Sequence, residues 1–199
     1  MGYGLITPRT FFKITNGKIS IKNPADGTES VYNFFEGYLR SISYVEKEVE
    51  YNGKRILMKS YNVSFVDAPD QESEHIWSAH PKSLIFQAFI NCILNVQDFS
   101  TTKIKLAPYL KNNQQRISIF ANGEKLNWKY QIDEMPPIEP VMGKNGKPVK
   151  DANGNPLWDY TARLEWIQEK VDQITTKLDG NSHYETVEDN DEELDAFDF

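Results

Sequence analysis

Cationic and aromatic side chains alternate through two stretches of this sequence. Side chains two residues apart on a strand point to the same face, so rings and cations can lie side by side there. Such a surface stacks bases on its rings and contacts phosphates through its cations, which suits single-stranded nucleic acid. The residues that fit are Tyr38, Arg40, Lys59, Tyr61, Lys103, Lys105, Tyr109, Lys111, Arg116, Trp128, Lys129 and Tyr130. About half of the aromatic residues should instead be core. We expect Tyr61 to be a stacking platform and Phe120 to be core.

Charge is distributed unevenly along the chain, whose net charge is −7. Residues 181–199 hold eight acidic residues and no Lys or Arg, while the rest of the chain has 22 basic against 21 acidic residues. Residues 101–132 are the basic part, with six Lys or Arg and one acidic residue before Asp133. The overall acidity therefore does not argue against a polyanionic partner.

Residue patterns for catalysis are weak. Cys92 is the only cysteine, and no nucleophilic serine motif or phosphate-binding glycine loop is present. Glu46, Glu48 and Glu50 share a strand face, which favours a solvated surface over a magnesium site. Three histidines match no metal-ligand spacing: His75, His80 and His183. We predict no enzymatic activity, no metal and no cofactor.

Three Asn-Gly pairs predict hairpin turns, because both residues of a type I′ turn adopt positive φ. The expected hairpins join residues 11–15 to 18–22, 31–49 to 55–66, and 115–121 to 125–132, with a further strand at 104–110. The long strands of the second hairpin predict a bulge, for which Gly37 is the expected place.

Two helices are predicted. Residues 82–96 are nearly continuously apolar and follow Pro81, which favours one buried helix over a pair of strands. Residues 159–180 carry apolar side chains at spacings of three and four, and Gly180 is the expected C-cap. This second helix either docks on the β-rich body or mediates dimerisation.

The chain divides into four parts: a β-rich body at 1–132, a Pro/Gly-rich mobile loop or loose hairpin at 133–158, the helix at 159–180, and a disordered acidic tail at 181–199. No signal peptide or membrane span is expected, which predicts a soluble cytoplasmic protein.

The tail combines carboxylates with large apolar side chains, which a merely solubilising tail would not need. Asp195, Phe197, Asp198 and Phe199 are therefore predicted to bind a basic, apolar pocket on a partner protein.

This tail motif and the strand-rich body with one inserted helix resemble the single-stranded DNA-binding proteins of bacteria and especially bacteriophages. The resemblance implies an OB-like antiparallel β-barrel that coats single-stranded DNA without sequence preference in DNA replication, recombination or repair. It also implies that the tail recruits replication or recombination proteins and can occupy the DNA groove.

The helix at 162–178 and the lack of a long Gly/Gln-rich linker depart from the common bacterial form. They favour a phage-type monomer or homodimer in the host cytoplasm. The alternatives are a virion or assembly structural protein with an acidic interaction tail, and an enzyme accessory module or nuclease with an unrecognised carboxylate site.

Overall fold

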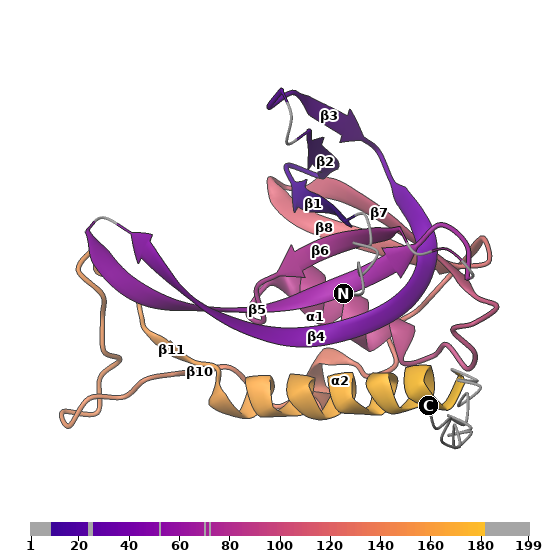
Figure 1. Cartoon of the computed structure of the whole chain (residues 1–199). Coiled ribbons are helices and arrows are strands. Elements are labelled where there is room, and N and C mark those ends of the chain that lie inside the picture. Colours follow the sequence, from indigo (N-terminus) through magenta and orange to yellow (C-terminus); the bar gives the residue numbers. More distant parts are fainter. Residues whose placement is uncertain (1–8, 24–25, 52, 70, 72, 182–199) are drawn as a thin grey trace, which may run out of the picture.

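The computed structural model describes residues 9–23, 26–51, 53–69, 71 and 73–181. This described part of the chain is mainly β, with one nine-stranded sheet, a small two-stranded sheet and two α-helices. In the large sheet the strands follow the order β3-β2-β1-β6-β5-β4-β7-β8-β9, and the sheet is strongly curved (Figure 1). The expected tail, including Asp195, Phe197, Asp198 and Phe199, lies outside the described residues.

The element bounds are β1 Arg9–Thr15, β2 Lys18–Lys22, β3 Glu29–Tyr32, β4 Phe35–Tyr51, β5 Lys54–Val66, β6 Glu74–Ala79, α1 Leu84–Ile93, β7 Lys103–Lys111, β8 Gln114–Ala121, β9 Glu124–Lys125, a 3-10 turn Ile132–Glu134, β10 Glu139–Pro140, β11 Trp158–Asp159 and α2 Thr161–Asn181.

The tight turns follow from residues that tolerate a left-handed backbone. Asn16 and Gly17, between β1 and β2, have φ values of 50° and 68°, which confirms the expected type of turn. Asn112 and Asn113 form a further turn between β7 and β8, with φ values of 51° and 57°. Short polar Asn side chains tolerate this conformation, so Asn-Asn closes a hairpin as Asn-Gly does.

The long hairpin differs from its sequence prediction in two respects. Its first strand is divided, because β3 pairs with β2 and β4 begins only at Phe35. The bulge lies between Leu39 and Ser41 and not at Gly37. Gly37 is needed for close packing, since a Cβ there would lie 3.0 Å from the Val66 carbonyl oxygen. The strand expected at 125–132 is also wrong beyond Lys125, where the chain leaves the sheet.

The expected antiparallel barrel is not what the sheet forms. β6 lies between β1 and β5 and pairs with β1 in parallel, so the sheet is mixed. The strand order runs from β3 to β9 without closing. The turn at Gly17 nevertheless packs closely on β7, where an added Cβ would lie 2.8 Å from the Tyr109 carbonyl carbon. Curvature therefore brings distant strands together without a hydrogen-bonded closure.

Both helices lie on one face of the sheet. α1 buries Phe86 and Phe89 against aromatic side chains of β5 and β6, such as Trp77. α2 contacts α1 and β4 and buries its apolar stripe, including Ile167 and Ile174, in the same core. Docking of the second helix is confirmed, although the helix continues through Gly180. Among the described residues, no helix combines the length and apolar character needed to span a membrane.

Candidate nucleic-acid interface

The face of the sheet opposite the two helices, called here the outer face, carries a stripe of rings and cations. Residues directly opposite one another in an antiparallel pair share a face. Tyr38 opposes Lys103, Lys105 opposes Phe120, and Tyr109 opposes Arg116. Their neighbours Ile104 and Leu106 are fully buried on the helix-covered face, so the alternate positions must point outward. We call Tyr38, Lys103, Lys105, Phe120, Tyr109 and Arg116, together with Phe34 and Lys125, the outer stripe.

Lys105 is the centre of this stripe. Its Nζ lies 4.1 Å from the centroid of the Phe34 ring and 5.9 Å from that of Phe120. Phe34 is 49% exposed, and Phe120 is partly exposed. Lys125 on β9 opposes Phe120 and extends the same row toward the sheet edge. Two accessible rings and two cations therefore lie within one short row that crosses β7, β8 and β9 and includes the residue before β4.

Sequence reasoning missed part of this row. Phe120 is not the core residue that was expected, because its alternation with buried Ile119 places it on the outer face. Phe34 was not singled out, although it occupies the break between β3 and β4 where the chain is exposed. Lys125 was noted only as part of the basic stretch. The break itself, at Asn33 and Phe34, has no signal in the sequence.

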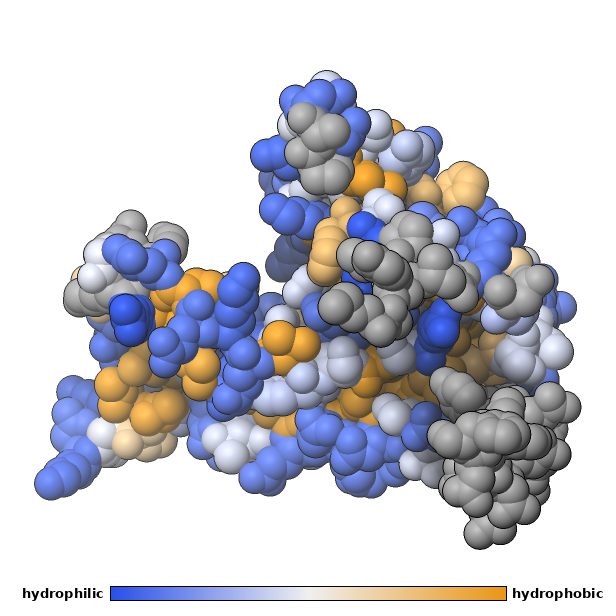
Figure 2. All heavy atoms as spheres, viewed as in Figure 1, coloured by the Kyte–Doolittle hydropathy of each residue, from blue (hydrophilic) through white to orange (hydrophobic). Residues whose placement is uncertain are grey.

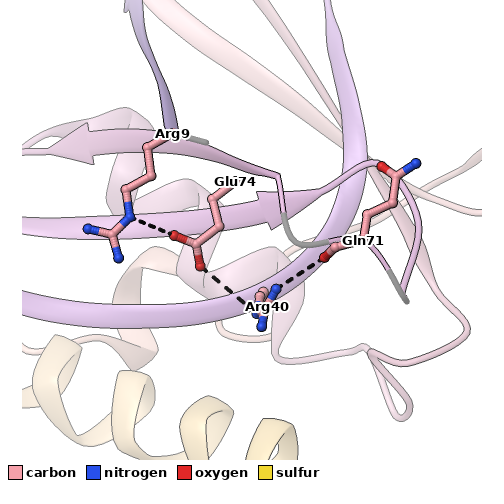
Figure 3. A network of polar contacts seen from close by, with 4 residues as sticks. All are labelled: Arg9, Arg40, Gln71 and Glu74. Carbon is pink, nitrogen blue, oxygen red and sulfur yellow. Dashed lines mark hydrogen bonds and ion pairs between the residues drawn. The ribbon is translucent and has the colours of Figure 1, made fainter. Parts of the chain in front are cut away.

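Two predicted cations of the outer face have acidic neighbours. Lys103 Nζ lies 3.8 Å from a carboxylate oxygen of Glu36. Arg40 lies at the bulge, where its Nε is 3.9 Å from Glu74 and its guanidinium donates a hydrogen bond to the Gln71 carbonyl oxygen. Glu74 also accepts from Arg9 on β1 at 3.1 Å (Figure 3). Arg40 therefore joins β4 to β6 and β1, which makes it less available to phosphates.

One of the predicted stacking residues, Tyr61, lies in the interior. Tyr61 is 3% exposed, and its ring stacks on Phe86 with centroids 4.9 Å apart. Its hydroxyl bonds to Gln168 of α2, and burial raises the pKa of Tyr61 to about 12. The prediction that Tyr61 is a stacking platform is wrong because its side of β5 faces α1.

Tyr130 packs edge-on against Trp166 at 5.5 Å. Its backbone N–H and carbonyl bond to the side chain of Asn91, so it fixes the 126–131 segment to α1. Tyr130 thus supports the fold more than it offers a surface.

Lys59 lies on the far part of the β4–β5 hairpin, called here the arm (residues 43–60). Lys59 Nζ is 3.1 Å from a carboxylate oxygen of Glu46, which also accepts a hydrogen bond from Tyr44 at 2.7 Å. The hydrogen bond from Tyr44, followed by the one from Lys59, lowers the pKa of Glu46. Lys59 is paired and distant in the sheet from the outer stripe.

The remaining predicted residues lie toward the other end of β7 and β8. Tyr109 is 42% and Trp128 39% exposed, and both contribute to a cavity along the edge of β8. Arg116 contributes to the same cavity and donates a hydrogen bond to Gln114 at 2.5 Å. Lys111 and Lys129 are exposed nearby. Tyr109, Arg116 and Trp128 therefore lie at the edge of β8, where the outer stripe meets this cavity.

The comparisons of this chain with protein-family models, with curated proteins and with solved structures found no match.

Proposed function

We propose that this protein binds single-stranded nucleic acid along the outer stripe, without sequence preference and without catalysis. The observation that carries the proposal is the row in which Lys105 lies between the Phe34 and Phe120 rings, flanked by Lys125. Every base has a π-face, so stacking on rings tolerates any sequence, at about 1 to 3 kcal/mol per base. Cations beside the rings supply the contacts to the phosphates between successive bases.

The electrostatics of the stripe support this proposal. Lys105, Arg116 and Lys125 have no ion pair within the described part of the chain, while Glu36 alone brings an acidic side chain into the row. Unpaired cations gain more from a phosphate than cations that must first release a carboxylate. A polyanion is therefore a better partner for this surface than a neutral or basic one would be.

The strongly curved sheet, whose other face is covered by the two helices, presents the strands of the outer stripe to a single strand of DNA. The inferred role in the cell is coating of single-stranded DNA during replication, recombination or repair. The acidic tail would recruit partner proteins through its phenylalanine and aspartate residues. These parts of the proposal rest on the sequence.

Fluorescence anisotropy tests the proposal with a labelled mixed-sequence oligonucleotide and the full chain. We expect saturable binding at micromolar or lower protein concentration, with single strands preferred over the matching duplex. The matched variants are Phe34→Ala and Phe120→Ala on the stripe, with Trp158→Ala as a control on the β10–β11 segment. Absence of binding, or an equal loss in the control, would refute the proposal.

A second function, assembly of a larger structure, has one observation in its favour. β5 pairs with β6 only over Tyr61–Phe65, and β4 with β7 only over Phe35–Tyr38. In the described chain the arm therefore pairs only with itself and leaves both of its edges unpaired. It also exposes Ile56, Leu57 and Met58, at 43%, 52% and 47%. Apolar surface gathers on this arm in Figure 2. Exposed apolar edges are sites where strands of other chains can be added. Sedimentation of an arm variant such as Leu57→Lys tests whether the arm mediates assembly.

A further inference from the structure

A cavity of about 860 Å³ lies between α1, the edge of β8, the 128–138 segment and the first turn of α2. This volume lies within the range of ligand pockets, which is about 300 to 1,000 Å³. Apolar side chains form most of its wall, among them Leu84, Ile85, Ala88, Ile117, Trp128 and Ile138. None of these residues belongs to the part of the outer stripe around Lys105.

One buried cation is part of this wall. Arg163 of α2 is 7% exposed. Its Nε donates a hydrogen bond to the Pro136 carbonyl oxygen at 2.7 Å, and one terminal nitrogen donates to Oε1 of Gln87 at 3.3 Å. In the described part of the chain, no carboxylate forms an ion pair with it. A buried charge without a counter-charge is costly, since it has lost its hydration without gaining an anion.

The amide of Gln87 is also incompletely bonded. Gln87 is 4% exposed, its oxygen accepts from Arg163, and its Nε2 has no partner. Gln115 Nε2, at the β8 side of the cavity, is likewise buried without a partner. A buried donor left unbonded has lost its hydrogen bonds to water without gaining a partner in the protein. The unbonded polar groups of this cavity are therefore hydrogen-bond donors, and a ligand that satisfies them must supply an acceptor.

The charges around the cavity also favour an anion. Arg116 and Arg163 contribute two positive charges to the lining, and Asp133, which is exposed, contributes one negative charge. Because Arg163 and Gln87 are directly bonded, their free donors lie close together and would hold a single head group. A planar carboxylate accepts two parallel hydrogen bonds from a guanidinium, which is the strongest arrangement available to Arg.

From this arrangement we propose that the cavity binds a small apolar carboxylic acid. The carboxylate accepts hydrogen bonds from Arg163 and Gln87, and the hydrocarbon part packs on the apolar wall formed by Leu84, Ile117 and Trp128. A neutral ligand of the same shape would bury the same apolar area and leave the Arg163 charge unpaired. Recognition therefore depends on the acid group, and affinity depends on both parts.

Isothermal titration calorimetry of the full chain tests this with octanoate as the acid and octan-1-ol as the matched neutral ligand. We expect octanoate to bind at least about 10-fold more tightly, which corresponds to about 1.4 kcal/mol, because only the acid forms a charge-assisted hydrogen bond with Arg163. The variant Arg163→Met keeps much of the apolar length of the side chain and should abolish this preference. Equal binding of the two ligands by the wild-type chain would overturn the proposal.

A second variant keeps the test decisive if Arg163→Met does not fold. Ala88 is partly buried on α1 and lines the cavity without bonding to either polar group. Ala88→Phe should therefore fill the space and weaken octanoate binding at least about 10-fold, with the circular dichroism spectrum unchanged. Undiminished binding in this variant would place octanoate elsewhere and overturn the proposal.

A capped Phe-Asp-Phe tripeptide serves as a competing ligand. If it binds 10-fold more tightly than octanoate, a difference of about 1.4 kcal/mol, the proposal is overturned in favour of a protein segment as the occupant.

Discussion

Replacing Lys105 by glutamine should remove about one phosphate contact. The affinity for an oligonucleotide should therefore depend less steeply on salt concentration. Lys105, Arg116 and Lys125 are the stripe cations that have no ion pair in the described part of the chain. At about −0.7 per contacted phosphate, three contacts give a slope of log K against log salt near −2.1. Raising salt from about 50 to about 200 mM should then weaken wild-type binding about 18-fold, and the variant only about 7-fold.

The assay is fluorescence anisotropy with one oligonucleotide at four or more salt concentrations. Lys144→Gln is the matched control, because Lys144 is exposed on the segment between β10 and β11 and lies outside the stripe. Its slope should equal that of the wild type. A wild-type slope near zero would refute phosphate binding, and an equal decrease in Lys144→Gln would show that the effect is one of overall charge.

Four other predictions concern Phe120, Tyr61 and the tail. Phe120→Ala should lose about 1 to 3 kcal/mol of oligonucleotide binding with its urea midpoint nearly unchanged, whereas a large loss of stability would assign Phe120 to the core. Tyr61→Ala should show the opposite pattern and lose about 3 to 5 kcal/mol in urea unfolding, because it removes a buried ring that stacks on Phe86. Since folding raises the pKa of Tyr61 to about 12, the unfolded chain ionises first, near pH 10, and stability should fall by about 1.4 kcal/mol per pH unit between these values. Tyr61→Phe should lack this decrease in urea titrations at alkaline pH. Deleting residues 182–199 should tighten oligonucleotide binding, mainly at low salt, because the eight tail acids no longer compete, and weaker binding would contradict this.

Local features of the sequence were enough to predict several elements. Asn16-Gly17 determines a tight turn by its own backbone preferences, so the first hairpin could be placed within two residues. The spacing of apolar residues from Leu164 to Leu178 predicted α2, because it produces one apolar stripe at helical period. Both signals depend only on residues that are near one another in the chain.

The face to which each strand residue points was decided by the tertiary structure. The sequence shows that Lys59 and Tyr61 share one face of β5, since side chains alternate along a strand. It does not show which face α1 covers, and α1 covers the face of Tyr61 and leaves Phe120 outside. The bulge at Arg40 also changes which residues face the core, because one inserted residue reverses the alternation of side chains for the rest of β4.

The parallel pairing of β6 with β1 and the cavity beside Arg163 had no local signal either. Both bring together residues more than 60 positions apart, such as Arg9 with Glu74 and Gln87 with Arg163. Such contacts form only when the whole core is packed, since the free energy that holds them comes from burial shared by many elements. The sequence by itself therefore determined the turns, the second helix and the supply of rings and cations. Packing alone decided which of those rings and cations lie together on an open surface.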